Sequence, residues 1–112
     1  MAKKLGILLL LLVALAAVPQ AAEAREFLCT GTATGHFTGY DGFYYSDWDE
    51  NSAWGTCQNA VNNWAIGLCA GQGTTPPFSI EYEVTEIWMG NWYFVGNDSV
   101  AWRCENGWPV YA

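Results

Sequence analysis

The stretch NSAWGTCQNAVNNWAIGLCAG, residues 51–71, decides the fold class of this 112-residue chain. Asn51 or Ser52 suits the cap at the start of a helix, and Gly71 suits the residue just past its end. Pro76 and Pro77 prevent the helix from continuing. The apolar residues recur at intervals of three and four, which places them on one stripe of a helix that ends near residue 70: Trp54, Cys57, Val61, Trp64, Ala65 and Leu68.

The segments around this helix have the patterns of β-strands, whose side chains alternate between two faces. Before the helix, residues 26–34 predict a strand in which threonines at 30, 32 and 34 alternate with the small residues at 29, 31 and 33. Residues 36–46 are typical of a loop or an irregular hairpin. After the helix, strand patterns occur at residues 79–89, 92–95, 99–104 and, as a short last strand, 108–111. The order β-α-β-β-β predicts a single α+β domain, with one helix packed on one face of a mostly antiparallel sheet.

The strand at residues 79–89 changes phase partway along. Ile80, Tyr82 and Val84 alternate with acids and threonine, but Glu86 then falls on the apolar face. Because a one-residue slip turns every later side chain to the other face, we expect a β-bulge near Thr85 and Glu86. Tight turns are expected at residues 90–91 and 96–98.

The N-terminus predicts export. Lys3 and Lys4 precede an apolar run at residues 5–18, and Ala22-Glu23-Ala24 has the small-residue pattern of a cleavage site. The run is shorter than the roughly 20 residues that span a bilayer. We therefore predict a signal peptide at residues 1–24 and one mature domain at residues 25–112, secreted or periplasmic.

The charge of the mature chain limits its partners. Arg25 and Arg103 are its only arginines or lysines, and they stand against ten acids, a net charge of −8. Nucleic-acid binding depends on clustered Lys and Arg, and anionic membranes attract basic segments. The sequence therefore predicts a protein or glycan partner, with no nucleic acid, and no membrane after signal cleavage.

The cysteines Cys29, Cys57, Cys69 and Cys104 predict two disulfides, because an exported chain with an even number of cysteines favours them over zinc. A helix holding both Cys57 and Cys69 separates them by about 18 Å, too far to bond. If the helix runs back against the first strand, its end lies near the start of that strand. This direction favours the pairs Cys29–Cys69 and Cys57–Cys104.

Aromatic residues predict a binding surface on the sheet face away from the helix. A turn at residues 90–91 pairs Trp88 with Tyr93 on that open face, and places Trp92 and Phe94 under the helix. An alternative is that residues 35–45 fold over these rings and cover them. The candidate binding residues are Trp88, Tyr93, Glu86, Arg103, Tyr44 and Trp108.

Metal binding and catalysis have weaker signals. Asp47, Asp49 and Asn51 match the first half of a calcium loop, but the glycine and glutamate expected later in that loop are absent. Since acids before a helix also cap it, calcium is an alternative and no other cofactor is expected. His36 is the only histidine and belongs to no recognisable catalytic motif.

The sequence thus predicts a small acidic binding module of unknown ligand and not an enzyme. One alternative is an inhibitor of a secreted enzyme that inserts its glycine-rich segment into the target. Another is a small calcium-dependent or hydrolytic protein that uses Asp47, Asp49 and His36.

Overall fold

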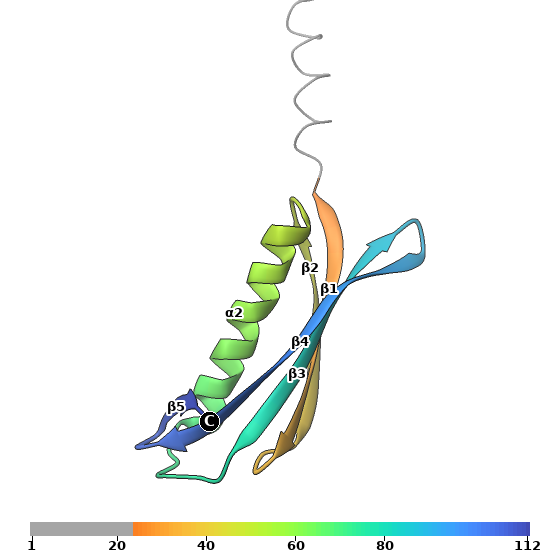
Figure 1. The fold of residues 1–112 in the computed structure, drawn as a ribbon. Coiled ribbons are helices and arrows are strands. Elements are labelled where there is room, and N and C mark those ends of the chain that lie inside the picture. Colours follow the sequence, from red (N-terminus) through yellow and green to blue (C-terminus); the bar gives the residue numbers. More distant parts are fainter. Residues whose placement is uncertain (1–23) are drawn as a thin grey trace, which may run out of the picture.

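The computed structural model describes residues 24–112, in which one helix packs on one face of a five-stranded antiparallel sheet (Figure 1). The predicted α+β class is confirmed, with its order of strand, helix and three strands. Residues 1–23 of the predicted signal peptide lie outside the described residues. The sheet order is β2-β1-β3-β4-β5. The elements are β1 (Arg25–Gly35), β2 (Gly39–Asp47), α2 (Glu50–Cys69), β3 (Phe78–Trp88), β4 (Asn91–Glu105) and β5 (Trp108–Tyr111).

Strand β2 lies where the sequence indicated a loop or an irregular hairpin. It pairs antiparallel with β1, from Ala33 opposite Gly39 to Arg25 opposite Asp47. The turn uses Gly35 at φ 100°, where a Cβ would lie 2.8 Å from the carbonyl oxygen of Pro77. This segment therefore extends the sheet sideways and does not fold over it.

Helix α2 begins one residue after its cap, Asp49, whose carboxylate accepts the backbone N–H of Ser52 at 2.7 Å. The cap thus lies two or three residues before the predicted ones. Gly71 follows the helix at φ 76°, as the sequence predicted. Among residues 24–112, no helix has the length and apolarity needed to cross a bilayer.

The core lies between α2 and the face of the sheet that it covers. Phe27 of β1 and Phe78, Ile80 and Val84 of β3 are fully buried there. Glycines let two helix tryptophans approach the sheet, because a Cβ at Gly31 would lie 3.2 Å from the Trp64 ring and one at Gly96 would lie 3.2 Å from the Trp54 ring. The face of β1 that carries small residues is thus the face against which the helix packs.

The disulfides join Cys29 to Cys57 and Cys69 to Cys104, so the predicted pairing is wrong. The reason is β2, which returns the chain to the start of β1 before the helix begins. As a result α2 runs in the same direction as β1 (Figure 1). The bond from Cys29 therefore reaches Cys57, in the first half of the helix. Two disulfides are confirmed, but their partners on the helix are exchanged. Cys29 bonds to Cys57 and not to Cys69, and Cys104 bonds to Cys69 and not to Cys57.

The β-bulge lies on β4 and not on β3. Val84 pairs with Gly96 and Thr85 pairs with Phe94, which leaves Val95 as the extra residue. Strand β3 keeps its phase, and Glu86 therefore faces the same side as Val84. The expected turn at residues 96–98 is also absent, because β4 runs without a break from Asn91 to Glu105.

Candidate functional site

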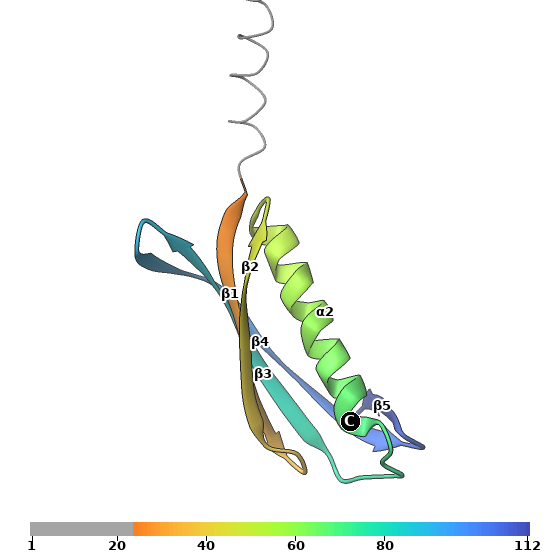
Figure 2. The same ribbon diagram turned by 180° about the vertical axis from the view of Figure 1, so that it is seen from behind.

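The end of the β3–β4 hairpin projects from the body and forms what we name the aromatic arm, residues 87–94 (Figures 1 and 2). Its turn is at Met89 and Gly90, with φ of 48° and 78°. This places the turn one residue before the predicted one. The segment contains no charged residue. Its exposed apolar side chains are Trp88, Met89, Trp92, Tyr93 and Phe94, from 48% to 83% accessible to solvent.

The rings of the aromatic arm point to both sides of the hairpin. Tyr93 pairs with Glu86, which puts Tyr93 and Trp88 on the helix side of the sheet. Trp92 and Phe94 lie on the opposite side, which is the open face. The predicted assignment of these four rings was therefore reversed, because the expected bulge was placed on the wrong strand. Trp88 and Tyr93 still share a face with each other, and with Glu86, as expected.

Glu86 lies inside the fold and binds Arg25. The Arg25 Nε donates to Glu86 Oε2 at 2.7 Å, and a terminal nitrogen of Arg25 donates to the other oxygen. The Glu86 side chain is only 12% exposed. Hydrogen bonds from Arg25 lower the pKa of Glu86 below its ordinary value. The predicted position of Glu86 on the open face is wrong, and its carboxylate already has a partner on β1.

The open face carries aromatic residues at the end nearest the aromatic arm. Tyr44 of β2 is 68% exposed, and its ring centroid lies 6.4 Å from that of Trp92. These two rings come from strands separated by β1 and β3, so they reach across the sheet. Residues 35–45 leave this surface uncovered, and the alternative in which they cover the rings is thereby overturned.

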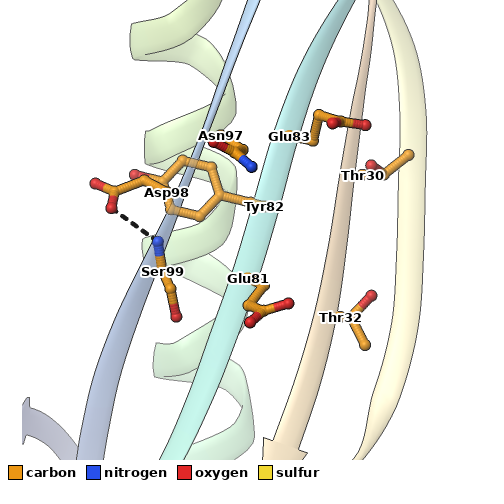
Figure 3. Close-up of a pocket in the computed structure, with 8 residues that line it drawn as sticks. All are labelled: Thr30, Thr32, Glu81, Tyr82, Glu83, Asn97, Asp98 and Ser99. Carbon is orange, nitrogen blue, oxygen red and sulfur yellow. Dashed lines mark hydrogen bonds between the residues drawn. The ribbon is translucent and has the colours of Figure 1, made fainter.

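Next to these rings, the sheet has a hollow of about 500 Å³ that we name the acidic groove (Figure 3). Its floor has two cross-strand rows, Thr30–Glu83–Asn97 and Thr32–Glu81–Ser99. The residues that line the acidic groove are Thr30, Thr32, Glu81, Tyr82, Glu83, Asn97, Asp98 and Ser99.

The acidic groove carries uncompensated negative charge among the described residues. The ion pairs within residues 24–112 join Arg25 to Glu50 and Glu86, and Arg103 to Glu105. Neither arginine reaches Glu81 or Glu83. The groove thus offers carboxylate, hydroxyl and amide groups, which can accept hydrogen bonds from a ligand.

Arg103 and Trp108 do not join the aromatic arm. The Arg103 guanidinium donates to Glu105 Oε1 at 2.9 and 3.1 Å. Trp108 lies in β5, at the other end of the molecule from the aromatic arm (Figures 1 and 2). It lines a separate hollow of about 200 Å³ together with Trp102 and Tyr111. Of the six predicted binding residues, the structure places Trp88, Tyr93 and Tyr44 in or beside the aromatic arm.

The predicted calcium residues form the entrance to α2. Asp49 caps the helix, and its pKa is lowered by the hydrogen bonds from Ser52. Asp47 accepts the Thr56 hydroxyl at 2.8 Å, while Asn51 lies in the first helical turn. Within residues 24–112, no three His, Cys, Asp or Glu side chains are grouped so that they could hold a metal ion.

Sequence reasoning missed Trp92, Phe94 and the polar residues of the acidic groove other than Glu81 and Glu83. The alternating threonines of β1 were a visible signal for the part of the groove floor that β1 supplies. The pairing of β3 with β4 was needed to place Asn97 and Ser99 beside them. Comparison of this chain with protein-family models, with curated proteins and with solved structures finds no match.

Proposed function

We propose that residues 25–112 form an exported, non-catalytic binding module that contacts its ligand through the aromatic arm and the adjacent acidic groove. The observation that carries this proposal is the exposure of Trp88, Trp92, Tyr93 and Phe94 on a hairpin that projects from the body. Exposed apolar patches of this kind mark interaction sites, and Trp and Tyr contribute strongly to binding energy. Two disulfides are compatible with an oxidising compartment outside the cytoplasm.

The two surfaces support a protein or glycan ligand. Flat rings on both sides of the aromatic arm provide apolar contact area with few rotatable bonds. Glu81 and Glu83 lie on the open face near these rings. Their carboxylates can accept hydrogen bonds from hydroxyl, amide or basic groups of the same ligand. A ligand that spans both surfaces gains apolar contact and directional hydrogen bonds together.

Inhibition of a secreted enzyme is the second candidate, and the projecting shape of the aromatic arm favours it. The glycine-rich segment expected to enter a target is instead the edge strand β2. The narrow hairpin with its tip at Met89 and Gly90 is the element shaped to enter a cleft. A calcium-dependent or hydrolytic function is supported less well, because Asp47 and Asp49 already accept hydrogen bonds at the helix entrance.

The proposal is tested by screening oxidised residues 25–112 against glycan and protein arrays, followed by variants of the aromatic arm. We expect Trp92→Ala and Tyr93→Ala to weaken a detected interaction at least tenfold. Trp108→Ala is the matched control, since that ring is 58% exposed but lies at the other end of the molecule. Equal affinity of the wild type and both arm variants would exclude the aromatic arm as the contact surface.

A further inference from the structure

Among residues 24–112, no strand pairs with the outer side of β2. Strand β2 forms one margin of the sheet, and its nine residues pair only with β1. The N–H of Gly42 donates to the carboxylate of its neighbour Asp41 at 2.8 Å, which shows that it points away from β1. Because backbone groups alternate in direction along an antiparallel strand, the amides of Tyr40 and Tyr44 point outward too.

The opposite margin of the sheet is protected against the addition of another strand, whereas β2 is not. Strand β5 has only four residues and includes Pro109, which has no N–H to offer. The part of β4 that β5 leaves uncovered is interrupted by the bulge at Val95. Bulges, prolines and short edges are the usual means of preventing strand addition. Strand β2 is long and contains no proline, no lysine and no register shift.

An apolar hollow of about 90 Å³, which we name the edge groove, runs between β2 and α2. Phe43 of β2 faces it, as do Val61 and Trp64 of the helix. A strand added beside β2 would direct every second side chain to this side of the sheet. The edge groove is large enough to take a small apolar side chain from such a strand.

The charges of β2 decide which strand would fit. Its only charged residues are Asp41 and Asp47, both acidic, and the mature chain carries a net charge of −8. A second copy would place these acids against its own and add the repulsion of two acidic bodies. A basic strand would instead be attracted by them.

We propose that β2 binds an extended basic segment of another protein by strand addition, with apolar side chains of that segment in the edge groove. The backbone ladder supplies affinity, and the edge groove and the acids supply selectivity. This site is separate from the aromatic arm, and it requires neither that surface nor the function proposed for it.

The test uses a fluorescent nine-residue peptide of alternating lysine and valine and two N-methylated versions of it. One version is methylated on the lysine amides and the other on the valine amides, so that each blocks one edge of the peptide. We expect the parent peptide and one methylated version to bind residues 25–112, and the other version to bind at least tenfold more weakly. Equal binding of both versions would show attraction by charge alone and overturn the proposal, as would no binding of the parent.

Protein variants locate the contact. Tyr44→Pro removes an outward N–H, whereas the control Tyr44→Thr removes the ring and keeps the N–H. We expect the proline variant to lose at least tenfold in peptide affinity and the threonine variant to lose less than threefold. Equal effects of the two changes would overturn the proposal. Sedimentation that finds a dimer of the wild type, which Tyr44→Pro converts to a monomer, would assign β2 to a second copy and overturn it too.

Discussion

The substitution Glu86→Gln tests whether Glu86 lies on the helix side of the sheet, as observed, or on the open face, as the sequence suggested. On the open face, a solvated glutamate would tolerate the change. In the structure, Glu86 accepts two hydrogen bonds from Arg25, and its side chain is 12% exposed. Glutamine keeps the shape of the side chain but removes its charge and one acceptor.

The expected magnitude follows from the burial of the pair. Hydrogen bonds to charged groups contribute about 1.5–3 kcal/mol, whereas exposed ion pairs contribute less than about 1 kcal/mol. Arg25 is 35% exposed and also lies 3.4 Å from Glu50, so it keeps some solvation and a second partner. We therefore expect Glu86→Gln to lower the free energy of unfolding at pH 7 by about 2 kcal/mol, or roughly 10 °C in melting temperature.

This loss should depend on pH in one direction. The pKa of Glu86 is lower in the folded state than in the unfolded chain, chiefly because of the hydrogen bonds from Arg25. Its stabilising effect is therefore complete above the unfolded pKa and disappears as the pH falls through the folded pKa. The wild type and Glu86→Gln should converge in acid.

Urea unfolding at a series of pH values between neutral and acid measures both effects. Glu83→Gln is the matched control, because Glu83 is an exposed glutamate on the opposite face of the same strand. It should change stability by less than about 0.5 kcal/mol. Equal effects of the two changes at pH 7, or a Glu86→Gln deficit that persists in acid, would refute this reasoning.

Three further predictions concern the body of the domain. Replacing Cys69 and Cys104 with alanine removes a link between residues 35 positions apart, and urea unfolding should show a loss of about 4 kcal/mol; a loss below about 1 kcal/mol would contradict the link. Burial and Asp47 raise the pKa of Tyr45 from 10.0 to about 12. Because the folded pKa is the higher one, this contribution to stability is complete below the unfolded pKa and disappears as the pH rises towards 12. Ultraviolet titration of the wild type and Tyr45→Phe should therefore diverge only near pH 12, and divergence near pH 10 would be inconsistent with a buried phenol. Gly96→Val should displace the ring of Trp54 and lower stability by about 1–3 kcal/mol in thermal unfolding, whereas an unchanged melting temperature would mean that the ring lies elsewhere.

The helix and the class of the fold followed from local patterns. The apolar stripe of α2 and the glycine at position 71 are local features, so the sequence alone located both ends of the helix to within three residues. The direction of the helix relative to the first strand could not be predicted from local patterns. Nothing local distinguishes a glycine-rich loop from the strand β2, and that strand decides which end of the helix lies beside Cys29.

The kinds of side chain on the open face were predicted from the sequence, but some of the residues that supply them were not. An open face with aromatic and acidic side chains was expected, and Glu81, Glu83 and Tyr44 lie on it. The expected tryptophan on that face was Trp88, whereas the observed one is Trp92. The faces were exchanged because a glutamate was not expected on the helix side of the sheet. The sequence did not show that Arg25 would bind Glu86 there. A bulge on β4 leaves no mark in the pattern of β3.

The bond between Cys69 and Cys104 also changes what a cut in the chain would do. A protease that cleaves the exposed tip between Met89 and Gly90 would divide the polypeptide into two pieces. The pieces would remain one covalent molecule, because Cys69 lies in the first and Cys104 in the second. The exposed hairpin is thus a position at which the chain can be cut while the bond keeps its two halves joined.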